Sequence, residues 1–484
     1  MLCYIALFVS LQIPQVFRQD ELNAHPANTR KIEQVFDKPR GEIVTADGVV
    51  LAQSVPTNPG NRFDLQRTYP TGDLFADVTG YFTLANGASQ VEKVYNDVLS
   101  GTTAAQVVNN IGDILGGNHD NSGTVELTLR ADFQRLAKQL LGQREGSIVM
   151  LDPRTGAVLA MYSWPSYDPN VIADHNTKAA TNRLRQLDSD PRNPLLANAY
   201  QERYMPGSTF KLVTTSTALT DGVVTPDTQF AVENQYTPPQ TNDPVENYGG
   251  KTCGGDLREV FRRSCNTPFA RTAVELGGDR FTAGADAFGL NDPPPFDLPR
   301  PAASFVNAPG EKFDQNLPIL AQRGFGSENV QITPLQMAMI AACIANGGEM
   351  MQPYVVARTV DHDGRTLSAT TPHVWKIPMT KDIADTMTQL MIGVVNGPNG
   401  TAQGRFTLPG GVQAAAKTGT AQLNKKGEKQ RSHVWITAFA PAEAPQFVVS
   451  VFLKGVNDEI SAGTGGRLAG PIANQMLTYA LLHP

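Results

Sequence analysis

Two strongly β-forming runs near the C-terminus, at residues 434–439 and 447–453, constrain the fold of this chain most. Both are dense in β-branched and aromatic residues, which favour strands. A hairpin is predicted far upstream, where residues 147–151 and 157–162 flank an Asp-Pro-Arg-Thr-Gly turn at 152–156. Strands at both ends of a segment, with helices between them, indicate an α+β domain on a mainly antiparallel sheet.

Helical patterns fill the sequence between these strands and close the chain. Thr333 opens one helix as its N-cap, with Pro334 at the first position and Gln336 at the third. The other helices are predicted at residues 208–221, 256–263, 382–394 and 469–482. We assign this segment to one domain at residues 143–484.

A smaller module precedes this domain. Asp47-Gly48 lies between two short apolar runs and is a strong hairpin signal. Residues 88–100 are a helical candidate, and a strand at 124–129 precedes a helix at 132–142. A chain of 484 residues is long enough for such a second unit, which we place at residues 18–142.

The N-terminal run at residues 1–17 is apolar and carries no charge before Arg18. A spanning helix needs about 20 apolar residues, and Gln12 and Pro14 interrupt this one. The basic start and small-residue cleavage site of a signal peptide are not evident. We interpret the run as a transmembrane anchor whose start lies upstream, which places the rest of the chain outside the cytoplasm. The alternative is a buried N-terminal helix of a soluble protein.

Charge and metal-ligating residues argue against several classes of function. The formal net charge is −6 and no long basic run is present, so nothing favours a nucleic-acid partner. The seven histidines and four cysteines show no metal-ligand spacing. Cys343 lies in an apolar helix and is predicted to be a buried thiol. Cys253 and Cys265 lie in a glycine-rich region of an exported domain, where a disulfide is possible but not decided by the sequence.

Ser208 and Lys211 form the first candidate for chemistry. Ser208 follows a Pro-Gly turn at a helix start, where free backbone N–H groups and the positive end of the helix dipole face outward. Lys211 lies three residues later on the same helical face, so the two can act as nucleophile and base. The alternative is an N-cap serine and a surface lysine, since about one Ser-x-x-Lys arises by chance in a chain this long.

Two later stretches favour the interpretation of Ser208 and Lys211 as a nucleophile and base. Ser264-Cys265-Asn266 ends the helix predicted at 256–263, and Lys417-Thr418-Gly419-Thr420 follows three alanines in a predicted strand. Gly419 there would permit close backbone approach by a ligand. Ser-x-x-Lys, Ser-x-Asn and Lys-Thr-Gly, in this order, resemble the motif set of penicillin-binding proteins and serine β-lactamases.

The resemblance covers nearly the whole chain. The Arg-Gly-Glu-Ile sequence at 40–43 with Asp47-Gly48 resembles the opening of the N-terminal module of class B penicillin-binding proteins. The stretches at 152–156, 166–170, 333–336 and 345–348 are similar to the transpeptidase domain of that family. The Glu-Asn-Tyr-Gly-Gly sequence at 246–250 and the placement of Cys253 and Cys265 are most similar to the actinobacterial, division-type branch.

The resemblance implies a β-lactamase/transpeptidase-like domain, with helices on both sides of an antiparallel sheet, behind a membrane anchor and a pedestal or dimerisation module. It implies a peptidoglycan D,D-transpeptidase in which Ser208 attacks the D-alanyl-D-alanine bond of a stem peptide. Lys211, desolvated and close to Lys417, would have a lowered pKa and take the serine proton. Ser264 would relay that proton to the departing D-alanine, and Asn266 would orient the peptide and the lysine.

Further expectations come from the same resemblance. The backbone N–H groups of Ser208 and Thr420 would form the oxyanion hole, and Lys417, Thr418 and Thr420 would hold the terminal carboxylate. Gly419 belongs to the same substrate-binding strand. The expected partners are stem peptides of lipid II-derived glycan strands, β-lactam antibiotics that acylate Ser208, and membrane glycosyltransferase or divisome proteins. The chemistry needs no metal or organic cofactor.

Other functions use the same motifs. A β-lactamase would be roughly half this length and would lack the first module. A D,D-carboxypeptidase differs only in resolving the acyl-enzyme with water, which the motifs cannot separate from transpeptidation. A non-catalytic β-lactam receptor or cell-wall scaffold is disfavoured because Ser208, Lys211, Ser264 and Lys417 are all present.

Overall fold

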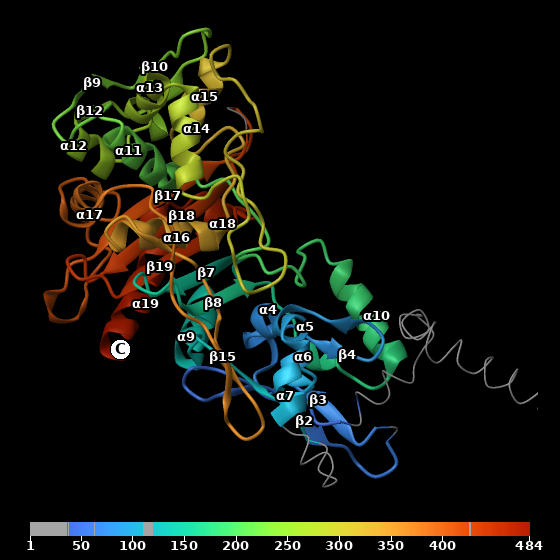
Figure 1. Ribbon diagram of the computed structural model, residues 1–484. Helices are drawn as coiled ribbons and strands as arrows, with labels where there is room; N and C mark the ends of the chain where they lie inside the picture. Colours follow the sequence, from blue (N-terminus) through green and yellow to red (C-terminus); the bar gives the residue numbers. More distant parts are fainter. Residues whose placement is uncertain (1–35, 37, 62, 110–119, 425–426) are drawn as a thin grey trace, which may run out of the picture.

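The computed structural model describes residues 36, 38–61, 63–109, 120–424 and 427–484 (Figure 1). The anchor predicted at residues 1–17 lies outside these ranges. Within them, none of the helices has the length and apolar character that crossing a membrane requires.

A five-stranded antiparallel sheet forms the centre of the larger domain, in the order β17-β18-β19-β7-β8. Its strands are β7 (Gly146–Leu151), β8 (Val158–Trp164), β17 (Ala415–Gln422), β18 (Ser432–Ala440) and β19 (Phe447–Leu453). The predicted hairpin and the two C-terminal β runs are therefore confirmed as strands of one sheet. Every residue of β18 and β19 is buried, which explains their unbroken apolar character.

Helices cover both faces of this sheet. Phe447 of β19 contacts Phe133 of α9 (Ala131–Leu141), which packs against α19 (Gly470–Leu482). Phe452 has the opposite parity on the strand and therefore points to the other face, where it contacts Tyr204 and Trp435. The helices α11 (Lys211–Thr220), α16 (Pro334–Ala345) and α17 (Lys381–Asn396) are in contact with one another. Thr333 caps α16 by accepting from the N–H of Gln336, as predicted.

A mainly helical region lies above the central sheet in Figure 1. It contains α11 together with α12 (Leu257–Arg262), α13 (Thr267–Leu276), α14 (Gly278–Ala287) and α15 (Leu317–Arg323). A two-stranded sheet of β9 (Gln229–Glu233) and β12 (Cys253–Asp256) leads into α12. Where this region meets the central sheet, the short helix η4 (Gly207–Phe210), which precedes α11, packs against strand β17.

The N-terminal module, at the lower right of Figure 1, is built on a six-stranded sheet in the order β15-β14-β6-β1-β2-β3. Its strands are β1 (Ile43–Val44), β2 (Val50–Pro56), β3 (Leu65–Thr68), β6 (Thr124–Leu127), β14 (Val356–Val360) and β15 (Thr366–Ala369). The hairpin predicted at Asp47-Gly48 is confirmed, since β1 pairs antiparallel with β2. The last two strands come from the far half of the chain, so the two units share a sheet.

Inside this module, Glu92 is fully buried between two arginines. Its carboxylate accepts from Arg40 Nε at 2.6 Å and from Arg67 Nε at 2.7 Å. The helix predicted at 88–100 is divided into α5 (Gln90–Val94) and α6 (Asn96–Leu99). The Arg40 guanidinium also donates to the Glu92 carbonyl at 2.7 Å, and so competes for the acceptor that would continue α5 into α6.

Candidate active site

The turn that carries Ser208 is held by hydrogen bonds to two other segments. It continues as the short helix η4 (Gly207–Phe210), which runs directly into α11. The Met205 carbonyl accepts from Trp435 Nε1 at 2.9 Å, and the N–H of Gly207 donates to the Gly326 carbonyl at 3.0 Å. Gly207 has φ +54°, and a Cβ there would lie 2.8 Å from the Thr420 carbonyl. Glycine is therefore required at this position.

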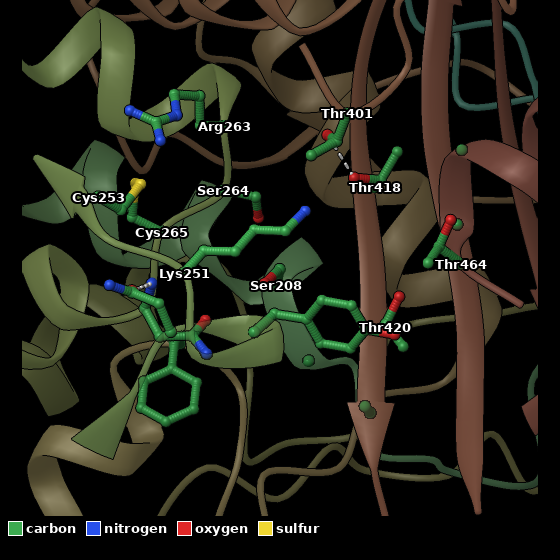
Figure 2. A pocket seen from close by; sticks show the side chains of 18 of the residues that line it. Ser208, Lys251, Cys253, Arg263, Ser264, Cys265, Thr401, Thr418, Thr420 and Thr464 are labelled. Carbon is green, nitrogen blue, oxygen red and sulfur yellow. Dashed lines mark hydrogen bonds between the residues drawn. A yellow bond between two sulfur atoms is a disulfide. The ribbon is translucent and has the colours of Figure 1, made fainter. Parts of the chain in front are cut away.

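Ser208 is half-buried and lines a pocket of about 590 Å³ between the helical region and strand β17 (Figure 2). Ser264, Asn266, Thr418 and Thr420 line the same pocket. Residues from three distant parts of the sequence therefore meet around one cavity.

Lys211 is fully buried directly behind this pocket. Its Nζ donates to the carbonyls of Ser264 (2.9 Å) and Cys265 (2.6 Å) and to Oδ1 of Asn266 (2.9 Å). Burial lowers the pKa of Lys211 well below its usual value, and repulsion from Lys417 acts in the same direction. In the described part of the chain, Ser208 Oγ makes no hydrogen bond with this amine.

The Ser264-Cys265-Asn266 stretch follows α12, as predicted. Ser264 has φ +58°, which turns its hydroxyl toward two lysines. Its Oγ accepts from Lys417 Nζ at 2.7 Å and lies 3.5 Å from Lys211 Nζ. Asn266 accepts from Lys211 through its oxygen and donates through Nδ2 to the Glu246 carbonyl at 3.0 Å.

Lys417 is also fully buried, and burial lowers its pKa to about 7. Besides Ser264, it donates to the Thr418 carbonyl at 3.1 Å. This carbonyl points away from β18, toward the open edge of β17. In a strand, residues two positions apart direct their backbone N–H and C=O groups to the same edge. The N–H of Thr420 therefore faces the same open edge of β17, beside the start of η4. Thr418 Oγ1 donates to Thr401 Oγ1 at 2.6 Å.

Gly419 has a packing role in this arrangement. A Cβ at this position would lie 2.7 Å from the Pro206 carbonyl and 3.0 Å from Thr209 Cγ2. Close approach by a ligand at Gly419 stays a prediction, and the structure shows that the turn of the nucleophile candidate also approaches closely here. The glycine thus allows Ser208 to lie against the strand.

Cys253 and Cys265 are joined by a disulfide, with Cα atoms 5.9 Å apart. Both cysteines line the pocket, and the bond ties β12 to the middle of the Ser264–Asn266 stretch. Cys343 is a buried free thiol in α16, and burial raises its pKa well above the usual value. Within the described ranges, no three His, Cys, Asp or Glu side chains are grouped so as to hold a metal ion.

Three site residues were not found by sequence reasoning. Asn247 accepts from the N–H groups of Asn266 and Thr267 at 2.7 and 3.1 Å, and so fixes the backbone of the motif. Its only signal was its place in the Glu-Asn-Tyr-Gly-Gly stretch. Thr401 and Thr464 also line the pocket, but lone threonines in loops carry no recognisable pattern.

Comparison with known proteins defines the class. The family model "Penicillin binding protein transpeptidase domain" matches residues 146–478, and "Penicillin binding protein A dimerisation domain" matches residues 40–125. The chain belongs to the penicillin-binding protein transpeptidases and combines their α+β catalytic domain with an N-terminal dimerisation module.

Individual relatives agree with this class. The chain is 36% identical to peptidoglycan D,D-transpeptidase PbpA of Mycolicibacterium smegmatis, over 99% of this chain and 97% of the relative. It is 35% identical to PbpA of Mycobacterium tuberculosis, over 99% and 96%. A crystal structure of PBPA from M. tuberculosis superimposes with a TM-score of 0.84 at 34% identity, covering 92% of this chain and all of that one. The chain is a serine-type peptidoglycan D,D-transpeptidase.

Proposed function

We propose that Ser208 is the nucleophile of this transpeptidase and Lys211 its base. The observation that carries the proposal is that Ser208 and Ser264 line one pocket, while the buried Lys211 and Lys417 both place their Nζ within hydrogen-bond distance of the Ser264 hydroxyl. An ammonium can donate to all three oxygens around Lys211 Nζ, but a neutral amine has two protons. The neutral form thus frees its lone pair, which can accept the Ser208 hydroxyl proton as Oγ attacks the carbonyl between two D-alanines.

The negative charge that develops on the carbonyl oxygen would be stabilised by backbone N–H groups. Ser208 lies in the first turn of η4, where N–H groups lack intrahelical acceptors, and the N–H of Thr420 faces the same edge. The proton then passes from Lys211 through the Ser264 hydroxyl to the amine of the departing D-alanine. Lys417 supports this relay, because its ammonium is hydrogen-bonded to the Ser264 oxygen.

The acyl-enzyme on Ser208 would be resolved by the amine of a second stem peptide, which forms the cross-link. Asn266 is positioned to orient the peptide, and Lys417, Thr418 and Thr420 to hold its terminal carboxylate, with Gly419 keeping their strand against the turn. β-Lactams would acylate the same serine. This is supported by structures of penicillin-binding protein A from M. tuberculosis as acyl-enzyme complexes with ceftriaxone, imipenem and penicillin G.

The remaining features fit an enzyme outside the cytoplasm. We place the membrane anchor at residues 1–17, the pedestal or dimerisation module at 18–142 and the catalytic domain at 143–484. Peptidoglycan strands derived from lipid II would supply both peptides, and membrane glycosyltransferase or divisome proteins are the expected partners. The Cys253–Cys265 disulfide is compatible with an oxidising compartment.

The reaction can be tested with a stem-peptide thioester and a D-amino acid as acceptor. Wild-type protein should give the aminolysis product, and Ser208→Ala should give none while retaining the wild-type melting temperature. Hydrolysis without aminolysis would indicate a D,D-carboxypeptidase instead. Full activity of Ser208→Ala would refute the assignment of the nucleophile.

A further inference from the structure

The charged side chains that line the active-site pocket are all cationic. Among the described residues that line it, Lys251 and Arg263 carry charges and no carboxylate is present. The opposite wall is rich in hydroxyl groups, from Thr401, Thr418 and Thr420. Such a cavity favours a ligand with a negative charge.

Of these two cations, Arg263 is already engaged within the protein. It donates to Glu259 Oε1 at 3.1 Å and to the Thr252 carbonyl at 3.0 Å. The buried Lys417 is likewise occupied by Ser264 and the Thr418 carbonyl. Lys251 is exposed and makes no hydrogen bond or ion pair with any part of the chain that the structure describes. Among the described residues that line the pocket, Lys251 is therefore the cation that has no acceptor within the protein.

The position of Lys251 is set by anchors on both sides of it. Asn247, four residues before it, is buried and bonded to the backbone of Asn266 and Thr267. Cys253, two residues after it, is covalently joined to Cys265. Gly249 and Gly250, with φ +68° and +67° and open space around them, lie between the first anchor and the lysine. The backbone around Lys251 is thus anchored to the catalytic motif, while the two glycines leave it conformational freedom on one side.

The side chain points into the pocket rather than away from it. In Figure 2, Lys251 extends across the cavity in the direction of the wall that carries Thr401 and Thr418. A peptide lying along β17 beside Ser208 would pass between this wall and the ammonium. A carboxylate of that peptide could then accept from Lys251 on one side and from threonine hydroxyls on the other.

We propose that Lys251 is a specificity residue that binds a carboxylate of the stem peptide across the pocket from β17. This inference rests on the proposed function of the pocket. Two carboxylates have the required chemistry. One is the terminal carboxylate of the peptide, which leaves with D-alanine, and the other is a side-chain carboxylate further up the stem, which stays on the acyl-enzyme.

The test compares Lys251→Gln with Lys251→Arg, which retains the charge. Lys178→Gln is the matched control, because Lys178 is an exposed lysine of α10 (Thr177–Asp188), which lies beside the N-terminal module in Figure 1. Three reactions are measured: acylation by penicillin, and aminolysis of two peptide thioesters with the upstream carboxylate either free or amidated. Loss of one charge-assisted hydrogen bond should change the affected kcat/KM about 3- to 20-fold, mainly through KM.

The outcomes separate the two carboxylates. If Lys251 binds the terminal one, Lys251→Gln slows acylation by penicillin, which carries a carboxylate in the equivalent place. If Lys251 binds the upstream one, penicillin acylation is unchanged and only the free-carboxylate peptide loses kcat/KM. In both cases Lys251→Arg restores most of the loss and Lys178→Gln matches wild type.

Equal rates for Lys251→Gln and wild type in all three reactions would overturn the proposal. The proposal would also be overturned if Lys251→Gln lost kcat/KM equally on the amidated and free peptides while its acylation by penicillin was unchanged. A wild-type protein that no penicillin acylates would instead overturn the proposed function of the pocket, so the two failures are distinguishable.

Discussion

Asp77 is a buried carboxyl group between the N-terminal module and the central sheet. It lies in α4 (Ala76–Thr79), which packs against β8, and its side chain is in the vicinity of Ser163 on that strand. The nearby Ser163 hydroxyl acts to lower the pKa of Asp77, but neither Asp77 oxygen has a well-formed hydrogen bond within the described part of the chain. Burial dominates and raises the pKa of Asp77 to about 7.

The raised pKa makes the stability of the folded chain depend on pH. Well below pH 4, the Asp77 carboxyl is protonated in both the folded and the unfolded chain and does not change the free energy of unfolding. As pH rises toward 7, the unfolded chain releases this proton while the folded chain retains it, so stability falls; above 7 the loss is complete. Raising the pKa of Asp77 from about 4 to about 7 lowers the free energy of unfolding by about 4 kcal/mol at most, because one pKa unit corresponds to about 1.4 kcal/mol. Asp77→Asn should remove this loss.

The assay is chemical unfolding between pH 4 and 8, with the difference between variant and wild type as the readout. Asp77→Asn should equal wild type near pH 4 and exceed it by about 1 to 4 kcal/mol at pH 8. Asp243→Asn, in an exposed loop, is the control and should follow wild type throughout. A constant difference in the free energy of unfolding between Asp77→Asn and wild type across this range would show that the Asp77 carboxyl does not titrate with a raised pKa.

Three further predictions concern the site. Gly419→Ala should slow penicillin acylation about 10- to 100-fold in a stopped-flow assay, because its Cβ would push the strand from the turn of Ser208; an unchanged rate would contradict the packing role. The pH–rate profile of acylation should rise with a midpoint well below the ordinary lysine pKa, because the neutral Lys211 is the base; a midpoint near that of free lysine would exclude it. Reducing the Cys253–Cys265 bond, which closes 12 residues, should cost about 3 kcal/mol and lower the melting temperature; Cys265→Ser should match reduced wild type and be insensitive to reductant.

The sequence predicted the catalytic domain well because its signals are local. The runs that became β18 and β19 are mostly apolar and fully buried, and each motif lies at the start or end of a helix or in a strand whose pattern is short-range. The cap of α16 at Thr333 and the hairpin at Asp47-Gly48 follow from turn and capping chemistry alone.

Features that depend on distant contacts were not predicted. The strands β14 and β15 carry no signal that they join the sheet of the N-terminal module, because the pairing of β14 with β6 spans nearly half the chain. The division of the 88–100 helix depends on Arg40, far upstream. Asn247 and Lys251 acquire their places only when the loop closes onto Asn266 and Cys265. These positions depend on tertiary contacts between distant segments, and such contacts leave no periodic pattern in the sequence.

Covalent labelling by penicillin tests whether Ser208 is the nucleophile. The peptide at residues 204–211 lies between Arg203 and Lys211 and is therefore released by trypsin, so an adduct on Ser208 is readily located by mass spectrometry. We predict one penicillin per chain, on this peptide and at Ser208, and none on Ser208→Ala. An adduct on any other residue, or an equal adduct on Ser208→Ala, would contradict the account.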